Sequence, residues 1–179
     1  MEIFWSIVVG VCVLAAAGYV WWHFVEHRLT VVSRGQVYTS AAMPVAALEK
    51  AVKRLGIRTV VDLRGPQEGE AEIAAEKALL EKLGVHHFNI DSPQVPPDEL
   101  RDRYLDWVME DAHRPALIHC NHGQGRAVLY GALWRIEAEG MDPERARKKC
   151  RFLTTRGSTF DLKKVKGAYL HNYQPGSKK

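Results

Sequence analysis

The sequence predicts an α/β fold: a central, mostly parallel sheet flanked by helices on both faces and preceded by one transmembrane helix. Two observations lead to this prediction. Short β-branched segments alternate with segments whose apolar residues recur at helical spacing, and strands separated by helices favour a parallel sheet covered on both sides. In addition, the segment "IFWSIVVGVCVLAAAGYVWW" (3–22) carries no charge, and it is about as long as a helix that crosses a ~30 Å hydrocarbon core.

The apolar segment has three interpretations, of which a retained membrane anchor is the first. A cleaved signal peptide usually has a basic start and an apolar stretch of about 7–15 residues. Here the start is acidic and the stretch is longer, and Trp21 and Trp22 fit an interfacial aromatic belt. We therefore expect residues 3–22 to contact the lipid bilayer. A cleaved signal, with its cleavage site in Ala15–Ala17, is the main alternative, and a buried core helix is the third.

The flanking charges favour one orientation in the membrane. Arginines follow the span at Arg28 and Arg34, and none precedes it. The positive-inside bias therefore favours a single-pass protein whose domain faces the cytoplasm.

The rest of the chain is predicted to form one domain. We expect a transmembrane anchor at 1–25, a juxtamembrane linker at 26–35, one folded domain at 36–173 and a flexible tail at 174–179. Within the domain, hydrophobic periodicity and Gly or Pro boundaries predict the elements. Strands are expected at 35–40 (an edge strand), 58–64, 85–90 and 115–120, and helices at 43–56, 68–84, from 97 onward, 126–140, 142–152 and 159–172.

Composition excludes some functions and leaves others open. The formal net charge is only +4, so we expect no nucleic-acid partner. The basic segments "RARKKCR" and "LKKVKG" are expected to be solvated helix faces, and attraction to anionic lipid or phosphorylated substrates is the alternative. The three cysteines do not form a disulfide framework, and no Cys/His cluster has zinc-ligand spacing. We expect neither a metal nor a cofactor.

The segment "LIHCNHGQGRA" (117–127) carries the clearest chemistry. Cys120 ends a predicted strand and Arg126 begins a predicted helix. A tight turn between them would point backbone N–H groups inward at a helix N-terminus, which is an arrangement that binds a tetrahedral anion. Gly123 and Gly125 allow the positive φ angles and close backbone approach that such a turn needs.

Cys120 would then lie at the bottom of a positively charged bowl. The helix end and Arg126 should stabilise its thiolate. A thiolate beneath a bound phosphate is an in-line nucleophile, and its attack would form a phosphocysteine intermediate. The planar fork of Arg126 can hold two equatorial oxygens, and it would bind the trigonal transition state better than the ground state.

The motif H-C-x-x-G-x-x-R, read here from His119 to Arg126, resembles the signature of the cysteine-dependent protein tyrosine and dual-specificity phosphatases. The wider chain is similar to small bacterial dual-specificity phosphatase-like proteins over about residues 35–155. The resemblance implies that Cys120 is the nucleophile, Arg126 the phosphate-binding arginine and His119 the residue that orders the loop. It also implies a backbone cradle formed by Asn121, His122, Gly123, Gln124 and Gly125.

The resemblance further implies a general acid, usually an aspartate on an upstream loop. It protonates the leaving oxygen and then activates water. Asp91 is the best match, because it follows a strand and precedes prolines; a role as a turn residue is its alternative. Asp98 is the second candidate, although its position in the first turn of a helix is sufficient explanation. Asp62 is expected to be structural.

Two features of the loop bear on activity. The family usually has Ser or Thr after the arginine, and that hydroxyl helps the thiolate leave; Ala127 therefore predicts a slow second step. Relatives that act on inositol phosphates often carry lysines where this chain has His122 and Gln124, which weakens the case for a highly phosphorylated inositide substrate. Cys150 could form a disulfide with Cys120 under oxidation, but a buried, inert thiol is the favoured interpretation.

The expected function is hydrolysis of a phosphate monoester on a phosphorylated protein, lipid or small molecule. Two alternatives stay open. The first is a catalytically weak or inactive phosphate-binding module, which is consistent with Ala127 and with the absence of a clearly identified general acid. A rhodanese-type sulfur transferase is disfavoured, because its loop typically has six residues, whereas Cys120 through Arg126 is seven.

Overall fold

The computed structural model describes residues 1–153 and 159–176, and it confirms the α/β class. Five strands form one sheet in the order β1-β2-β5-β3-β4. The strands are β1 (Thr30–Ser33), β2 (Val37–Ala41), β3 (Thr59–Asp62), β4 (His86–Asn89) and β5 (Ala116–Cys120). All neighbours pair in parallel except β1, which runs antiparallel to β2. The carboxyl ends of β2 to β5 therefore meet at one edge, called the catalytic edge below.

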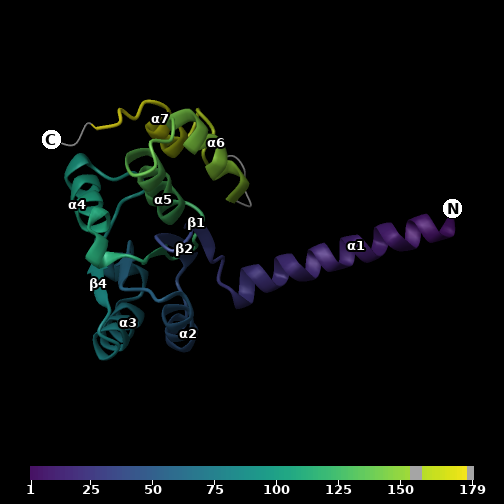
Figure 1. Cartoon of the computed structure of the whole chain (residues 1–179), viewed down its shortest axis with the longest axis horizontal. Coiled ribbons are helices and arrows are strands. Elements are labelled where there is room, and N and C mark those ends of the chain that lie inside the picture. The colour runs from purple at the N-terminus through teal and green to yellow at the C-terminus, as the bar shows by residue number, and fades with distance from the viewer. Residues whose placement is uncertain (154–158, 177–179) are drawn as a thin grey trace.

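Helices cover both faces of this sheet (Figure 1). One face carries α2 (Val45–Leu55) and α3 (Glu70–Lys82) over a small core that includes Leu48, Val60 and Leu80. The other carries α4 (Asp98–Met109), α5 (Arg126–Glu137), α6 (Pro143–Leu153) and α7 (Val165–His171). Helix α5 is buried along most of its length, so its first residue is fixed at the catalytic edge. Short 3₁₀ turns lie at Pro66–Glu68 and Asp111–His113.

Strand β1 is the main departure from the expected organisation. The segment 26–35 was expected to be a linker, but Thr30–Ser33 pairs with β2 through Thr30–Thr39 and Val31–Tyr38. The prediction of β2 as an edge strand was therefore wrong, since β1 covers its outer side and β5 its inner side. Four β-branched or small residues were too short a segment to stand out from the preceding apolar residues.

The last predicted helix was also too long at its start. Helix α7 begins at Val165 rather than near 159, because residues 159–164 form turns. Gly167 lies against this turn: a Cβ atom built on it would come within 2.0 Å of the carbonyl oxygen of Asp161. This contact sets the position of α7, and α7 carries a residue of the site.

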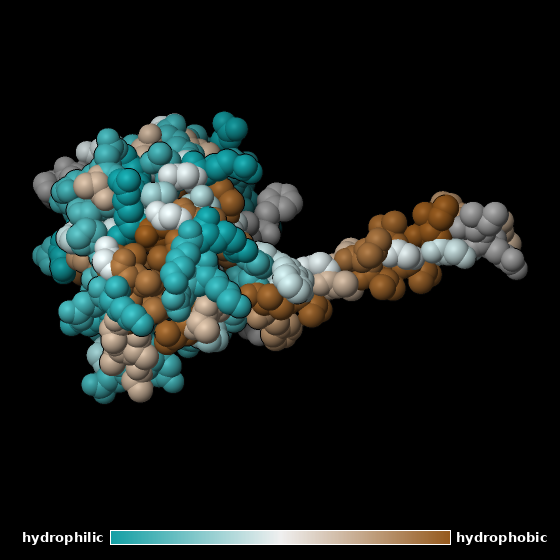
Figure 2. All heavy atoms as spheres, turned by 60° about the horizontal axis from the view of Figure 1, so that its bottom comes forward, coloured by the Kyte–Doolittle hydropathy of each residue, from teal (hydrophilic) through white to brown (hydrophobic). Residues whose placement is uncertain are grey.

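The first helix projects from the domain (Figure 1). Helix α1 (Glu2–Val20) continues into a π-helical turn, Trp21–Val25. Apolar side chains surround it, whereas the domain surface is mostly hydrophilic (Figure 2). Among the described residues it is the one helix, Phe4–Val25, that is long and apolar enough to cross a membrane by length and composition.

Replacing Gly167 with alanine should destabilise the domain. Helix propensity alone would predict a gain, because alanine is favoured over glycine by roughly 0.8–1.0 kcal/mol in a helix. The close approach of Asp161 to this position predicts the opposite sign, since overpacking typically costs about 1–3 kcal/mol. Thermal unfolding of the detergent-solubilised chain should show a lower Tm for Gly167→Ala. An unchanged or higher Tm would mean that α7 can shift without cost.

Candidate active site

The loop between β5 and α5 lies at the catalytic edge and is anchored to the end of β2. Cys120 is the last residue of β5 and is buried. The backbone N–H of Ala42 donates to the carbonyl oxygens of Cys120 at 2.8 Å and Asn121 at 3.3 Å. Both carbonyls thus face β2, which leaves the other side of the loop to the N-terminus of α5.

Gly123 is the residue that this packing requires. Its φ is +63°, and a Cβ there would lie 2.4 Å from the backbone nitrogen of Ala41. Any larger side chain would combine left-handed strain with a backbone clash. The glycine therefore lets the loop turn tightly against β2 while Arg126 begins the helix.

Arg126 is held by two segments of the chain, one that follows β3 and one that follows β4. Its Nη1 donates to the carbonyl oxygens of Leu63 (2.6 Å) and Ser92 (3.1 Å), and its guanidinium makes a bidentate ion pair with Glu68 at 2.6 and 2.5 Å. Burial on its own would lower the pKa of Arg126, but Glu68 and the neighbouring Cys120 outweigh it and raise that pKa. The side chain is therefore a fixed, buried cation beside Cys120.

Lys166 of α7 is a second cation at the loop. A Cβ built on Gly125 would lie 3.2 Å from its Cε and 3.4 Å from its Nζ, and Nζ donates to Gln94 Oε1 at 2.5 Å. The side chain is buried, so the expectation that "LKKVKG" is a solvated face was wrong at this position. Burial, and then Arg126, lower the pKa of Lys166 although Cys120 acts in the opposite direction.

The two candidate acids lie in different surroundings. Asp91 is the second residue after strand β4. Its φ is +38°, a positive value that is uncommon for residues other than glycine. Its Oδ1 lies 2.2 Å from the position of a Cβ on Gly65, and the next residue, Ser92, contacts Arg126. Asp98 instead makes a surface ion pair with Arg101 at 2.6 Å. Asp91 therefore lies at the catalytic edge in a strained conformation of the kind that clusters at functional sites.

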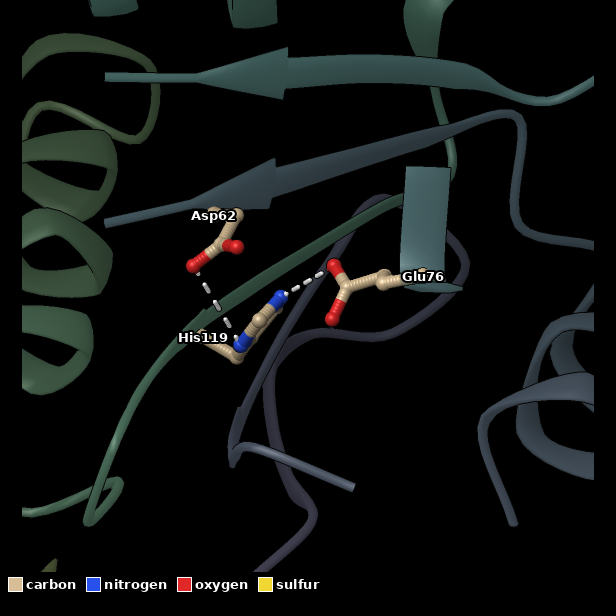
Figure 3. A group of neighbouring side chains, drawn as sticks. All are labelled: Asp62, Glu76 and His119. Atoms are coloured by element: carbon tan, nitrogen blue, oxygen red, sulfur yellow. Dashed lines mark hydrogen bonds and ion pairs between the residues drawn. The ribbon is translucent and has the colours of Figure 1, made fainter. Parts of the chain in front are cut away.

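His119 points away from the loop into a buried charge cluster (Figure 3). Its Nε2 lies 2.7 Å from Glu76 Oε1, and its Nδ1 lies 3.8 Å from Asp62 Oδ1. Arg64 joins both carboxylates at 2.9 Å and 2.7 Å. This cluster clamps β3, β5 and α3 together behind the loop, and it places Asp62 in the structural role that was expected.

His87 of β4 completes the cluster. Its Nε2 lies 3.5 Å from Glu76 and 3.9 Å from Asp62. Burial alone would lower the pKa of His87, but the two carboxylates outweigh it and raise that pKa to about 9. Burial would raise the pKa of Glu76, yet the histidines lower it to about 2. Asp62, Glu76, Arg64 and His87 are therefore charged near neutral pH.

Asp62, Glu76 and His119 are close enough to one another to ligate a cation. Arg64, however, already donates to both carboxylates, and His87 supplies a further positive charge. A divalent ion would have to displace the guanidinium of Arg64. The donor set therefore fits an internal ion-pair network better than a metal centre.

The second buried cysteine has no visible part in the site. Cys150 of α6 is almost fully buried, and its Sγ lies 3.9 Å from the carbonyl oxygen of Val128. Burial raises the pKa of Cys150 to about 12. Because the thiol stays protonated, it is a poor partner for thiol exchange.

Sequence reasoning missed several residues that surround the predicted loop. Glu68 was taken as the start of a helix, Lys166 as a surface residue, and Ser92 was not singled out. A local pattern cannot pair Arg126 with a carboxylate 58 positions earlier. The one available signal was the position of Glu68, shortly after a strand whose carboxyl end had to lie beside that of β5.

The fold is that of a dual-specificity phosphatase-like protein, and the comparisons with known proteins show the family. A family model described as "DSP-PTPase phosphatase fused to NAD+ Kinase" matches residues 29–167. The chain belongs to this dual-specificity phosphatase-like family. It is also 26% identical over 128 residues to the dual specificity protein phosphatase TpbA of Pseudomonas aeruginosa strain UCBPP-PA14. The match covers 70% of this chain but only 55% of that relative.

Solved structures share the fold. The core catalytic domain of the PP-IP phosphatase SIW14 from S. cerevisiae, in complex with citrate, has a TM-score of 0.67 at 19% identity and covers 84% of this chain and 87% of its own. P. aeruginosa TpbA in complex with pTyr has a TM-score of 0.59 at 20% identity, with 82% and 89% covered. These likenesses establish the architecture on which the site is built.

The charge cluster should make stability depend on pH through His87. A raised pKa in the folded state means that the stabilisation is complete below the unfolded value of 6.5 and is lost as pH rises through about 9. Urea unfolding of the detergent-solubilised chain should therefore give a free energy of unfolding that falls across this window. The His87→Gln variant should have a lower free energy of unfolding than the native chain below pH 6.5. Between pH 6.5 and about 9 its free energy of unfolding should fall less than that of the native chain. Equal losses in the two proteins would contradict a charged His87.

Proposed function

We propose that this chain is a phosphatase that hydrolyses phosphate monoesters through a phosphocysteine intermediate on Cys120. The proposed substrates are phosphotyrosine, phosphoserine and phosphothreonine of proteins, or a phosphorylated lipid. The observation that carries the proposal is the buried Cys120 at the start of a seven-residue loop that ends in an anchored Arg126. The named activity of the TpbA relative supports it.

The first step is in-line attack by the Cys120 thiolate on phosphorus. The S–P bond forms as the P–O bond to the leaving group breaks, and Asp91 donates a proton to the departing oxygen. The loop N–H groups and the guanidinium of Arg126 bind the three equatorial oxygens. Arg126 is held in place beforehand by Glu68, Leu63 and Ser92, so little reorganisation is needed as charge develops.

The second step returns the enzyme to its starting state. Asp91, now ionised, removes a proton from a water molecule that attacks phosphorus, and the thiolate of Cys120 leaves. Ala127 offers no hydroxyl to this thiolate, and it is fully buried in α5. Hydrolysis of the intermediate is therefore the slow step. If it were too slow for turnover, the chain would act as a phosphate-binding module, which is the second candidate function.

The helix Phe4–Val25 is proposed to be a retained membrane anchor. None of its described side chains is buried, and none of them enters the core of the domain. This exposure argues against the third interpretation of the segment, a helix buried in the core. The orientation with the domain toward the cytoplasm rests on Arg28 and Arg34.

Removal of the acid should affect difficult leaving groups most. Phenol has a pKa near 10 and needs protonation as it departs, whereas p-nitrophenol leaves readily as its anion. Asp91→Asn should thus lower kcat/KM, which reports the first step, by about 100-fold for phenyl phosphate and much less for p-nitrophenyl phosphate. Asp98→Asn is the matched control and should change neither, and Cys120→Ser should abolish both. Equal losses for the two substrates would show that Asp91 is not the acid.

Restoring a hydroxyl after the arginine should speed the second step. With p-nitrophenyl phosphate, stopped-flow absorbance should show a burst of p-nitrophenol close to one equivalent of enzyme, followed by slow turnover. Ala127→Ser should raise the steady-state rate several-fold and shrink the burst, while Ala132→Ser, farther along α5, should not. A native enzyme without a burst would contradict slow hydrolysis of the intermediate.

A further inference from the structure

We propose that the catalytic pocket opens onto the membrane surface and that its substrate is a phosphate monoester carried on a lipid headgroup. This inference rests on the proposed phosphatase function and on a retained anchor. It selects one of the substrate classes named above. Three observations carry it: where the apolar helix ends, what borders the pocket on its other side, and which side chains line the pocket.

The apolar helix ends beside the catalytic loop. Because β1 is antiparallel to β2, the chain enters the sheet at the edge where the parallel strands end. The N–H of Ala41 donates to the carbonyl oxygen of His27 at 2.8 Å, and Ala41 is the residue against which Gly123 packs. Only Glu26 lies between His27 and Val25, the last residue of the apolar span. The loop therefore lies at the level where the helix leaves the membrane.

The junction between helix and domain is held by several contacts. The backbone N–H of Arg28 donates to the carbonyl oxygen of Trp22 at 2.9 Å. The indole N–H of Trp22 donates in turn to the carbonyl oxygen of Leu29 at 3.0 Å. The Arg28 Nε donates to His23 Nδ1 at 3.0 Å. Glu26 pairs with Arg54 of α2 at 2.6 Å. These contacts restrict how far the domain can swing, so the catalytic edge stays near the bilayer.

A second membrane-compatible segment borders the pocket on the side of α7. Leu162 and Val165 are 50% and 67% exposed, and the two lysines between them are exposed as well. The next residue is Lys166, which lies over Gly125. Exposed apolar side chains beside lysines favour contact with an anionic lipid surface. The pocket thus has apolar or basic surface on both flanks.

The pocket itself favours a polar headgroup over a phosphotyrosine ring. The pocket adjoins the loop that follows Cys120, measures about 510 Å³ and is lined by Arg28, Gln94, His122, Gln124, Gly125, Thr159 and Lys166, a list that does not include Cys120 or Arg126. Among these described lining residues the imidazole of His122 is the one aromatic ring, and none is aliphatic. An aromatic ring gains most of its binding energy from apolar contacts, which this wall does not provide. Hydroxyls and a second acidic group of a lipid headgroup would instead meet amides and the cations Arg28 and Lys166.

The test uses the full chain reconstituted in phosphatidylcholine vesicles, after flotation has shown that it stays bound to them. Phosphate release is measured from phosphatidylinositol 4-phosphate in the same vesicles, from its deacylated headgroup in solution, and from a phosphotyrosyl lipopeptide in the vesicles. p-Nitrophenyl phosphate serves as the soluble reference. We expect the vesicle-borne lipid to be hydrolysed at least tenfold faster than the free headgroup or the lipopeptide.

Each of the other outcomes contradicts one identifiable part of the proposal: the lipid substrate, the phosphatase function or the membrane anchor. Turnover of p-nitrophenyl phosphate with no preference for the lipid overturns the headgroup proposal alone, and a preference for the lipopeptide identifies a phosphoprotein substrate instead. No turnover of any substrate overturns the proposed function as well. A chain that does not float with vesicles overturns the anchor.

Two variants separate membrane contact from catalysis. The double variant Leu162→Ser/Val165→Ser should lower the ratio of lipid to p-nitrophenyl phosphate rates at least fivefold. Met109→Ser, which removes an exposed apolar side chain from the end of α4, should leave that ratio unchanged. Equal ratios in the two variants would contradict a membrane-facing pocket.

Discussion

Arg126 is the point at which the catalytic edge is held together. The guanidinium joins the segments that follow β3 and β4 to the helix that follows β5, through Leu63, Ser92 and Glu68. These segments are far apart in sequence, but they meet here because the carboxyl ends of parallel strands lie at one edge of the sheet. A buried, paired cation at this junction is costly to disturb. The proposed phosphate cradle and the proposed acid loop are therefore positioned by one side chain.

A second constraint acts from the opposite face of the sheet. His119 precedes Cys120, so alternation along β5 turns its ring toward α3 and away from the loop. There it meets Glu76, with Asp62, Arg64 and His87 completing an ionised cluster. His119, to which the family resemblance assigns the ordering of the loop, belongs to this cluster. It can therefore fix the end of β5 from the side of the sheet that carries α3. Whether this also orders residues 121–125 stays a prediction.

Much of this architecture could be predicted from the sequence, for identifiable reasons. The strand over 58–64 is rich in β-branched residues, and those over 85–90 and 115–120 are short apolar segments. The predicted helices over 43–56 and 68–84 end at glycines, so the order of the elements and the parallel sheet followed. Strand β1 was missed because its pairing partner, not its own pattern, makes it a strand. Glu68 and Lys166 were missed because they reach the loop only in three dimensions. The roles of Cys120, Arg126 and Asp91 come from the motif and remain predictions.

The central claim is that phosphate passes through a covalent bond to Cys120. Rapid acid quench of the native chain with p-nitrophenyl phosphate, followed by mass spectrometry of the peptide that contains Cys120, tests it directly. The slow second step expected from Ala127 should let the intermediate accumulate, so the peptide should carry one added phosphoryl group in the steady state. Product formation with an unmodified Cys120 peptide at every quench time, under conditions that preserve a thiophosphate, would contradict the account.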